Sequence, residues 1–486
     1  MNDVSQLTRP KVLIVAHEFP PIGGVSVQRP YKFTQYLPEF GWDPVILTQD
    51  ALYSATWDES LLAWLEEKQI PVYRAKNPMM KAQSWLHRRR QKQSTHSAQA
   101  DQGASPLAKR AVGTSQPAGA TSARSLLRGT LQRQARRVRQ ALLIPDDAIL
   151  WLPAAISEGL RAIKEHHVSA IYATSPPESA QLVAAILSEK TGIPLVADFR
   201  DPWIGNLHRS EKGARHRIES DLEAFVFSRA GRVTTVTESF RATFAARYPR
   251  YAYKLSVISN GFDSRDLRIP EKATNDDQMV IYYGGILYEK RSPETFLRGL
   301  HTALRQGLLP RDKVLVRFAG VFDYPGKSAN RELVTALGLE DVVDLVGYVP
   351  HASHAALMAH ADLLLVIGDQ APGASAYVPA KVYEYLGVGK PILGVIQQGE
   401  ASRLILDCKA GKVVEPGQVE GVAELLRDFY MLWSTRELAA WQHHPLAASY
   451  ERREQARVLA TLLQEMTNGQ QSDRQTSARH GAIAGS

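Results

Sequence analysis

The sequence predicts an α/β protein with two doubly wound, parallel-stranded domains, and three observations lead to this fold class. Apolar, β-branched runs alternate with helical patterns along almost the whole chain. These runs form two series, separated near 262–278 by the polar, turn-rich stretch FDSRDLRIPEKATNDDQ. The 486 residues also exceed one ordinary hydrophobic core, because a domain usually takes ~150 residues.

Eleven apolar runs are predicted to be strands. Continuous runs of this kind are typical of parallel strands that are buried on both faces of a sheet. The first series covers residues 11–16, 44–48, 169–174, 194–199, 232–237 and 254–259. The second series covers residues 279–285, 314–320, 342–349, 361–367 and 391–396. Two such series, each interleaved with helices, predict two doubly wound sheets.

The expected domain boundaries follow from these series. We expect an N-terminal domain at 1–265 and a C-terminal domain at 266–445, followed by a helix at 446–466 that returns to the N-terminal domain. An insertion at about 76–145 interrupts the first domain. Its centre is poor in bulky apolar residues and cannot bury enough surface to offset the entropy of ordering. The polar tail at 467–486 is expected to be disordered.

The net charge of +8 is concentrated in the insertion. Residues 81–140 carry 13 Lys and Arg and one acid, which leaves 45 basic and 49 acidic residues in the rest of the chain. The folded part is therefore mildly acidic, and no nucleic-acid partner is expected. Leucines and arginines at 126–143 permit a basic amphipathic helix. Such a helix would either lie on an anionic membrane surface or pack one face on the domain.

Three features bear on the compartment. The single cysteine, Cys408, excludes an intramolecular disulfide framework and indicates a reducing environment. The N-terminus MNDVSQLTRP lacks the apolar core of a signal peptide. No stretch reaches the roughly 18 apolar residues of a membrane span. We therefore expect a cytoplasmic protein, with 81–140 as the candidate for a peripheral membrane contact.

A glycine-containing turn near the N-terminus is the first candidate binding element. The stretch HEFPPIGGVSVQRP, residues 17–30, places Gly23 and Gly24 between a predicted strand and an amphipathic helix. Glycine lets the backbone approach a ligand closely, and a helix start presents unpaired N–H groups and a positive dipole end. Together these features suit a phosphate group. From this stretch alone, a tight turn without a ligand is an equal alternative.

The second candidate element lies at residues 368–396, GDQAPGASAYVPAKVYEYLGVGKPILGVI. The pattern predicts a loop, a short helix from about Pro379, a C-cap at Gly389 and then a strand. Lys381 and Glu384 are three positions apart and share a helix face. They would lie at the carboxyl edge of a parallel sheet, where α/β proteins bind ligands. A glutamate there can accept both hydroxyls of a ribose; an ordinary surface ion pair is the alternative.

Five stretches in order resemble the GT-B-fold glycosyltransferases of family four. The nucleotide-sugar signature of that family is similar to PAKVYEYLGVGKPIL, and its opening strand, glycine loop and helix are similar to residues 17–48. The other matching stretches are VTTVTESFRATFAARYP with KLSVISNGFD, YYGGILYEKRSPETFLRGL and VGYVPHASHAALMAHADLLLVI. The resemblance implies two Rossmann-like domains facing across a cleft and a sugar transfer that retains the anomeric configuration.

The resemblance also implies roles for individual residues. The N–H of Gly24 would contact the diphosphate of the donor, with Gly23 making the turn. Lys290 and Arg291 would neutralise the diphosphate as it leaves, because fixed cations stabilise developing charge without reorganising. Candidate nucleotide-sugar-binding residues of the second domain are Gly284, Gly285, Lys381 and Glu384. The chain has no D-x-D motif, which agrees with a mechanism that needs no metal ion.

Three positions depart from the family pattern. The first of two glutamates is replaced by Ala376, so the transferred sugar must be held by other groups. Gly285 replaces an arginine that is often found after the first glycine of its loop, which puts more of the electrostatic stabilisation on Lys290 and Arg291. A histidine expected at 173–178 has no counterpart.

The stretch DFRDPWIGN, residues 198–206, is the candidate acceptor-side loop. It follows a predicted strand and combines two acids with Arg200 and Trp203. Asp198 and these residues are candidates for contact with acceptor or sugar, and Asp201 for assisting the acceptor hydroxyl. The alternative is a loop held by an Arg–Asp pair with tryptophan packing. For His17 and Trp151 elsewhere in the domain, a structural role is the favoured interpretation.

The sequence thus predicts a retaining, metal-independent glycosyltransferase without cofactor. Its partners would be a nucleotide-sugar donor and a saccharide or lipid-linked acceptor in surface polysaccharide synthesis. Two alternatives remain open: a scaffold subunit that keeps the fold without turnover, and a nucleotide-sugar epimerase of the same fold. Neither the sugar, the nucleotide base nor the oligomeric state is predicted.

Overall fold

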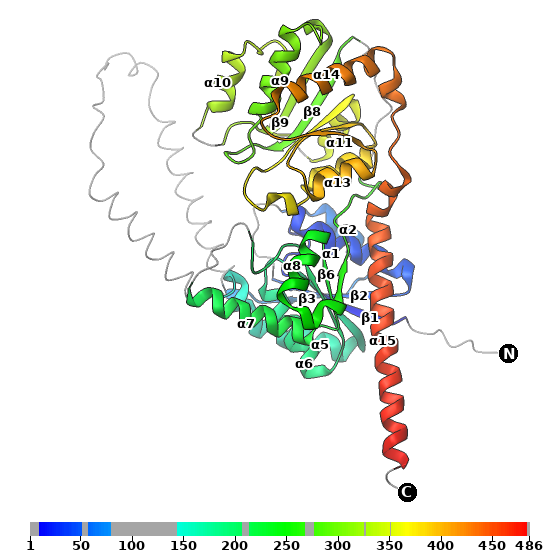
Figure 1. The fold of residues 1–486 in the computed structure, drawn as a ribbon. Helices are drawn as coiled ribbons and strands as arrows, with labels where there is room; N and C mark the ends of the chain where they lie inside the picture. Colours follow the sequence, from blue (N-terminus) through cyan, green and yellow to red (C-terminus); the bar gives the residue numbers. More distant parts are fainter. Residues whose placement is uncertain are drawn as a thin grey trace, which may run out of the picture. The chain divides into compact units, whose positions relative to one another are not determined.

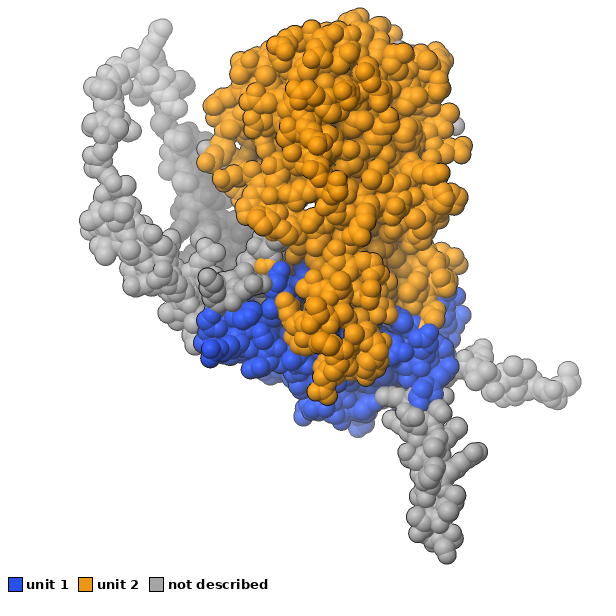
Figure 2. Space-filling view, viewed as in Figure 1, with its two compact units in different colours: residues 1–205, 209–233, 462–486 blue, residues 206–208, 234–461 orange. Residues whose placement is uncertain are grey.

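The computed structural model describes residues 9–50, 57–78, 143–206, 213–267, 277–324, 327–349 and 351–483 (Figure 1). The predicted insertion therefore lies almost wholly outside the described residues, as do the basic segment 81–140 and nearly all of the amphipathic stretch at 126–143. Contacts divide the chain into two compact units (Figure 2). The first unit comprises 1–205, 209–233 and 462–486, and the second comprises 206–208 and 234–461.

The first sheet has seven strands in the order β3-β2-β1-β4-β5-β6-β7. The strands are β1 (Lys11–Val15), β2 (Asp43–Gln49), β3 (Val72–Ala75), β4 (Val168–Ser175), β5 (Leu195–Phe199), β6 (Arg232–Thr235) and β7 (Leu255–Val257). The pairings of β1 with β2 and β4, of β2 with β3 and of β4 with β5 are parallel. The helices in this part are α1 (Val25–Tyr36), α2 (Ser60–Glu67), α5 (Leu152–His166), α6 (Ser179–Thr191), α7 (Ala214–Arg229) and α8 (Glu238–Arg247).

The second sheet has six parallel strands in the order β10-β9-β8-β11-β12-β13. The strands are β8 (Met279–Ile286), β9 (Val314–Val321), β10 (Val343–Gly347), β11 (Leu363–Ile367), β12 (Ile392–Val395) and β13 (Gly411–Val414). Its helices are α9 (Glu294–Arg305), α10 (Ala329–Ala336), α11 (His351–His360), α12 (Ala380–Val388), α13 (Glu400–Asp407) and α14 (Val419–Ser434).

Helices cover both faces of the second sheet, and the side chains of β8 alternate between them. Met279, Ile281 and Tyr283 enter a core with α9 and α14, which lie side by side in Figure 1. Val280 and Tyr282 enter the opposite core, which α11, α12 and α13 complete. Both faces of the strand are thus buried, which explains its unbroken apolar run.

In each sheet, the order in which successive strands are added reverses at the strand that comes first in the sequence. In the first sheet β2 lies on one side of β1 and β4 on the other; in the second, β9 and β11 flank β8 in the same way. The loops that follow the two strands on either side of such a point diverge, which leaves a crevice at the carboxyl edge. The glycine loop after β1 and the loops after β8 and β11 are therefore the structural candidates for ligand binding.

All eleven predicted strands are present, and two further strands were not predicted. These are β3 and β13, the outer strands at one edge of each sheet. Both have four residues and contain a charged side chain, Arg74 in β3 and Lys412 in β13. An edge strand needs fewer apolar residues than a central one, so its pattern resembles that of a loop.

The C-terminal helix differs from the expectation. We expected a helix at 446–466 and a disordered tail at 467–486, whereas α15 spans Arg452–Ile483. The packed first turns supply the costly helix nucleus, after which each added residue gains a hydrogen bond. No helix in the described part of the chain combines the length and apolar character that crossing a membrane requires.

Cys408 lies at the C-cap of α13 and belongs to the core beneath α11–α13. Its side chain is 0% exposed. Burial raises the pKa of its thiol to about 11, with a smaller contribution from Asp407. The thiol is therefore protonated and inaccessible in the folded protein.

Candidate functional site

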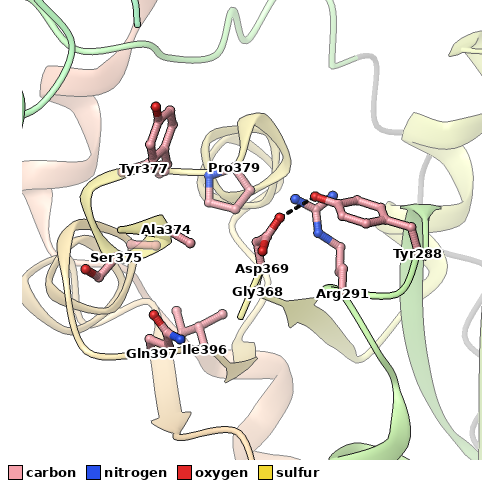
Figure 3. Close-up of a pocket in the computed structure, with 12 residues that line it drawn as sticks. Tyr288, Arg291, Gly368, Asp369, Ala374, Ser375, Tyr377, Pro379, Ile396 and Gln397 are labelled. Atoms are coloured by element: carbon pink, nitrogen blue, oxygen red, sulfur yellow. Dashed lines mark hydrogen bonds between the residues drawn. The ribbon is translucent and has the colours of Figure 1, made fainter. Parts of the chain in front are cut away.

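Two loops meet at the carboxyl edge of the second sheet, between β8 and β11. They enclose a pocket of about 190 Å³ (Figure 3). One wall is formed by Tyr288 and Arg291, and the other by the loop that leads from β11 into α12. The Tyr288 hydroxyl donates to Asp369 Oδ2 at 2.5 Å, and the Gln370 N–H donates to the Lys290 carbonyl at 2.7 Å. These two bonds tie the walls together.

Helix α12 follows this loop, and its predicted bounds are confirmed. It begins at Ala380 directly after Pro379 and ends at Val388. Gly389 has φ 76° in the left-handed region, and its N–H donates to the carbonyls of Tyr385 and Leu386. Proline suits the helix start because its missing N–H would be unpaired there, and glycine suits the left-handed C-cap. The helix thereby presents Lys381 and Glu384 from its first two turns.

Lys381 carries a buried ammonium group without a hydrogen-bond partner in the described part of the chain. The Nζ atom lies 3.8 Å from the centre of the Tyr283 ring, a cation–π distance. Burial lowers the pKa of this amine well below its ordinary value. The neighbouring Arg291 lowers it further, whereas Glu384 opposes the shift. The predicted alternative of a surface ion pair between Lys381 and Glu384 is therefore wrong.

Gly284 and Gly285 lie where other side chains crowd the backbone of β8. A Cβ on Gly285 would come within 2.8 Å of Lys381 Nζ, and its φ of 134° strains any L-residue. A Cβ on Gly284 would lie 3.0 Å from the Tyr282 hydroxyl. The Gly284 N–H donates to the Tyr385 hydroxyl at 3.2 Å. The absence of an arginine at 285 thus has a steric explanation in this chain.

Glu384 is half-buried on the same helix. Its carboxylate forms neither an ion pair nor a hydrogen bond with any residue that the structure describes. The carboxylate contributes to raising the pKa of Tyr282, after the larger effect of burial. A partly buried carboxylate with free acceptor oxygens is able to receive hydroxyl donors from a ligand.

The neighbouring cations Lys290 and Arg291 do not point into one pocket. Arg291 lines the 190 Å³ pocket, with its guanidinium carbon 5.0 Å from the centre of the Tyr288 ring. Its Nε is buried and has no hydrogen-bond partner among the described residues. Lys290 is exposed and lines a separate pocket of about 690 Å³ together with Tyr324 and Lys327. The two predicted cations are therefore distributed over two pockets.

The glycine loop of the first unit has the predicted strand–loop–helix form. Gly23 is buried, while Gly24 is exposed with φ 103° and forms the N-cap of α1. The helix starts at the next residue, Val25, and no side chain of the described residues caps it. The first N–H groups of α1 are thus available to an anion. The roles of the two glycines in diphosphate binding stay predictions.

The interpretation of Asp198 and Trp203 as ligand-contacting residues is wrong. The Asp198 carboxylate is 0% exposed and accepts from Arg29 Nε at 2.9 Å and Nη2 at 2.8 Å. It also accepts from Tyr172 and Thr174. Trp203 is fully buried. The alternative, a loop held by an Arg–Asp pair, is correct in that Asp198 pairs with an arginine. That arginine is Arg29 of α1, and the sequence of the loop itself could not identify it.

The other two polar residues of this loop have different surroundings. Arg200 donates to the carbonyls of Ser175, Ser26 and Pro176, which fixes the loop to β4 and α1. Asp201 is half-buried. Its role in assisting the acceptor hydroxyl stays a prediction.

His17 and Trp151 pack against each other, as the structural interpretation predicts. Their ring centres are 5.1 Å apart at an interplanar angle of 86°. Trp151 is 0% exposed and offers no surface for stacking a sugar. Burial lowers the pKa of His17 to about 4, against opposing effects of Asp146 and Glu18. The imidazole is therefore neutral near pH 7.

His17 is expected to make the folded protein sensitive to mild acid. The unfolded chain binds a proton at this histidine near pH 6.5, whereas the folded chain does so only near pH 4. Stability contributed by the neutral ring is thus present above pH 6.5 and lost as the pH falls toward 4. We expect the His17→Gln variant to show a flatter decline of unfolding free energy over this window. Urea denaturation at several pH values measures the difference.

The half-buried His216 on α7 provides the control for this prediction. A His17→Gln profile with the same slope as the wild type would contradict the buried, neutral state of His17.

Several residues of the candidate site have no signal in the sequence. Tyr283 looks like one more apolar residue of a buried strand, although its ring faces the Lys381 ammonium. Tyr288 and Asp369 join the two loops but are far apart in sequence. The only available signal was their position directly after strands at the carboxyl edge of the sheet.

The family model described as Glycosyltransferase Family 4 matches residues 112–266, and the model described as Glycosyl transferases group 1 matches residues 263–440. No curated protein matches the chain.

Solved structures share the fold over nearly the whole chain. Alr3699/HepE of Anabaena, solved in complex with UDP, is 17% identical, with 96% of this chain and 100% of that chain covered and a TM-score of 0.52. A glycosyltransferase from Rickettsia africae ESF-5 is 12% identical, with coverages of 94% and 98% and a TM-score of 0.57. Sucrose-phosphate synthase from Thermosynechococcus elongatus is 14% identical, with coverages of 97% and 100% and a TM-score of 0.50. At these identities the likeness establishes the shared two-sheet fold.

Proposed function

Because the chain belongs to the GT-B glycosyltransferases of family four, as its motifs predict, we propose that it transfers a sugar from a nucleotide-sugar donor to a saccharide or lipid-linked acceptor. The transfer retains the configuration at the anomeric carbon and requires no metal ion. Its place is the cytoplasmic side of a membrane, in surface polysaccharide synthesis. The basic composition of residues 81–140 supports a peripheral contact there.

The observation that carries this proposal is the pair of cations Lys381 and Arg291. Both have a buried nitrogen without a hydrogen-bond partner in the described residues, and Arg291 lowers the pKa of Lys381. Burial without a nearby anion disfavours the charged form of such a basic group. A diphosphate supplies the missing negative charge. The fold relative Alr3699/HepE was solved in complex with UDP, which supports a nucleotide of this kind.

The remaining candidate residues receive roles that match their surroundings. Glu384 accepts the two ribose hydroxyls, since its oxygens are uncommitted among the described residues. Gly284 and Gly285 form the floor beside the phosphates. Lys290, which is exposed, reaches the departing diphosphate from the side of β9.

The chemistry required of these groups is electrostatic. Breaking the bond between the anomeric carbon and the phosphate oxygen leaves an additional negative charge on the nucleoside diphosphate. Lys381, Arg291 and Lys290 of the second unit stabilise that charge. Asp201 orients the acceptor hydroxyl.

A ligand panel tests the proposal. Thermal unfolding is measured with UDP, GDP, ADP, dTDP and their common sugars, with and without a chelator. We expect the nucleotides of one base to stabilise the folded protein by about 2.7 kcal/mol at a hundredfold excess over Kd. The chelator should leave both the stabilisation and the transfer of labelled sugar unchanged.

The panel and an analysis of the products formed without acceptor together separate the two alternatives. Ala376, which leaves the sugar without its usual glutamate, favours a scaffold subunit. Binding of no nucleotide would support the scaffold. Conversion of the bound nucleotide sugar to its isomer without an acceptor would support an epimerase.

A further inference from the structure

Gly285 and Lys381 fit one another in this structure. The glycine has no side chain, and Lys381 Nζ lies only 2.8 Å from where its Cβ would be. The lysine reaches this position from α12, while the glycine belongs to β8. The ammonium thus occupies space beside the backbone that a side chain at position 285 would otherwise fill.

The groups around the ammonium leave its charge uncompensated. β8 contributes the face of the Tyr283 ring, the loop after β8 contributes Arg291, and α12 contributes Glu384. The titratable groups next to these residues are Tyr385 of α12, which interacts with Glu384, and Tyr282 of β8, whose hydroxyl lies 2.6 Å from His354 Nδ1 of α11. No oxygen in the described part of the chain accepts a hydrogen bond from Nζ. Of the charged groups near Nζ, Arg291 lowers the pKa of Lys381 and Glu384 raises it.

This arrangement resembles a cation site prepared for an anion that arrives with the ligand. A ring face stabilises an ammonium only weakly compared with an ion pair. Both the repulsion by Arg291 and the burial favour the uncharged amine in the free protein. A phosphate oxygen at hydrogen-bond distance would reverse that preference, because it favours the charged form.

We propose that Lys381 binds the diphosphate of the donor in place of the side chain that Gly285 lacks, and that binding adds a proton to its amine. This inference rests on the proposed function, since it needs a nucleoside diphosphate at the site. The proton comes from the buffer and goes to Nζ; no covalent bond changes. Gly285 is then a positioning residue, because it keeps the space for the ammonium open.

The proposal has a definite pH dependence. The protonated amine binds the diphosphate and the neutral amine does not. Affinity therefore rises as the pH falls through the range between the pKa of the amine in the complex and its lower pKa in the free protein. Proton uptake is confined to the same range.

Calorimetry measures this uptake directly. The full-length protein is titrated with the nucleoside diphosphate that stabilises it best, in buffers of different ionisation enthalpy, over a series of pH values. The wild type should take up a fraction of a proton that approaches one, and Lys381→Met should lose this uptake and about tenfold or more in affinity. The control is Lys313→Met. Lys313 directly precedes the first residue of β9, at the amino edge of the sheet, and this variant should behave as the wild type.

A double-mutant cycle tests the role of Gly285. Gly285→Ala should displace the ammonium and lower affinity by about tenfold. In the Lys381→Met background the same change should lower affinity clearly less, because only the backbone strain at φ 134° remains and no ammonium is left to displace. Equal effects of Gly285→Ala in both backgrounds would overturn the pairing.

The outcomes separate the inference from the proposed function. Nucleotide binding without proton uptake, or uptake that persists in Lys381→Met, overturns the inference and leaves the proposed function intact. Binding of no nucleotide overturns both. A ligand-free measurement adds a further check: Lys381→Met should raise the melting temperature, since it removes a buried amine without a partner. A lower melting temperature would speak against the uncompensated amine.

Discussion

The Glu384→Gln variant is expected to lose about a hundredfold or more in nucleotide affinity while keeping its folded stability. A hydrogen bond to a charged group contributes about 1.5–3 kcal/mol, and the proposed ribose contact has two of them. In the described residues the carboxylate has no partner, so its removal costs the free protein little. The loss should therefore appear in binding alone. Calorimetric titration with the nucleotide and thermal unfolding without it measure the two effects separately.

A matched control makes this result specific. Glu424 is exposed on α14, which covers the other face of the second sheet. Glu424→Gln removes the same charge from the same unit and should leave nucleotide affinity unchanged. If Glu384→Gln also bound like the wild type, the ribose would have to be held elsewhere.

Asp198→Ala is expected to lower the free energy of unfolding of the first unit by about 3–5 kcal/mol. Arg29 and Asp198 are 1% and 0% exposed, and their guanidinium and carboxylate pair through two hydrogen bonds. Truncating the acid leaves a buried guanidinium without its counter-ion. It also removes the acceptor for the hydroxyls of Tyr172 and Thr174. Chemical denaturation followed by circular dichroism measures the loss.

Two variants show whether the uncompensated charge is the cause. Asp43→Ala removes a partly exposed carboxylate 3.8 Å from Arg9 and should cost less than about 1 kcal/mol. The double variant Arg29→Met/Asp198→Ala removes both buried charges and should be more stable than Asp198→Ala. A double variant that is less stable than the single one would indicate that packing of the arginine, rather than its charge, dominates.

Asp198 shows which kind of contact the local sequence cannot predict. Asp198 follows a strand at the carboxyl edge of a sheet, where ligand-contacting acids are common. Whether such an acid faces a ligand or a buried partner depends on α1, which approaches from 169 positions earlier in the chain. Spacing within one loop carries no information on a pairing of that sequence separation.

Periodicity and local signals predicted the framework well. Central strands have long apolar runs because both of their faces are covered, and α12 has Pro379 and Gly389 at its two ends. These features depend on nearest neighbours along the chain. The strands β3 and β13 were not predicted because a strand at the edge of a sheet needs fewer apolar residues than a central one.

The candidate site was predicted as a set of residues but not as an arrangement. Lys381 and Glu384 lie at helical spacing, which left a surface ion pair as the alternative interpretation, yet the lysine turns toward Gly285 and the face of Tyr283. Lys290 and Arg291 are neighbours in sequence but line different pockets. Side-chain direction at the end of a strand depends on the packing of other elements, which the local sequence does not encode.

The burial of Cys408 gives this chain a reporter of its own unfolding. It is the only cysteine in the sequence, and its thiol is fully enclosed and protonated in the folded state. An aromatic disulfide reagent can reach it only when the core beneath α11–α13 opens, so the rate of labelling follows the population of the opened state. Labelling of the Cys408 thiol therefore measures the opening of the second unit separately from that of the first, without an engineered probe. A ligand that binds the second unit would slow the labelling in proportion to its occupancy.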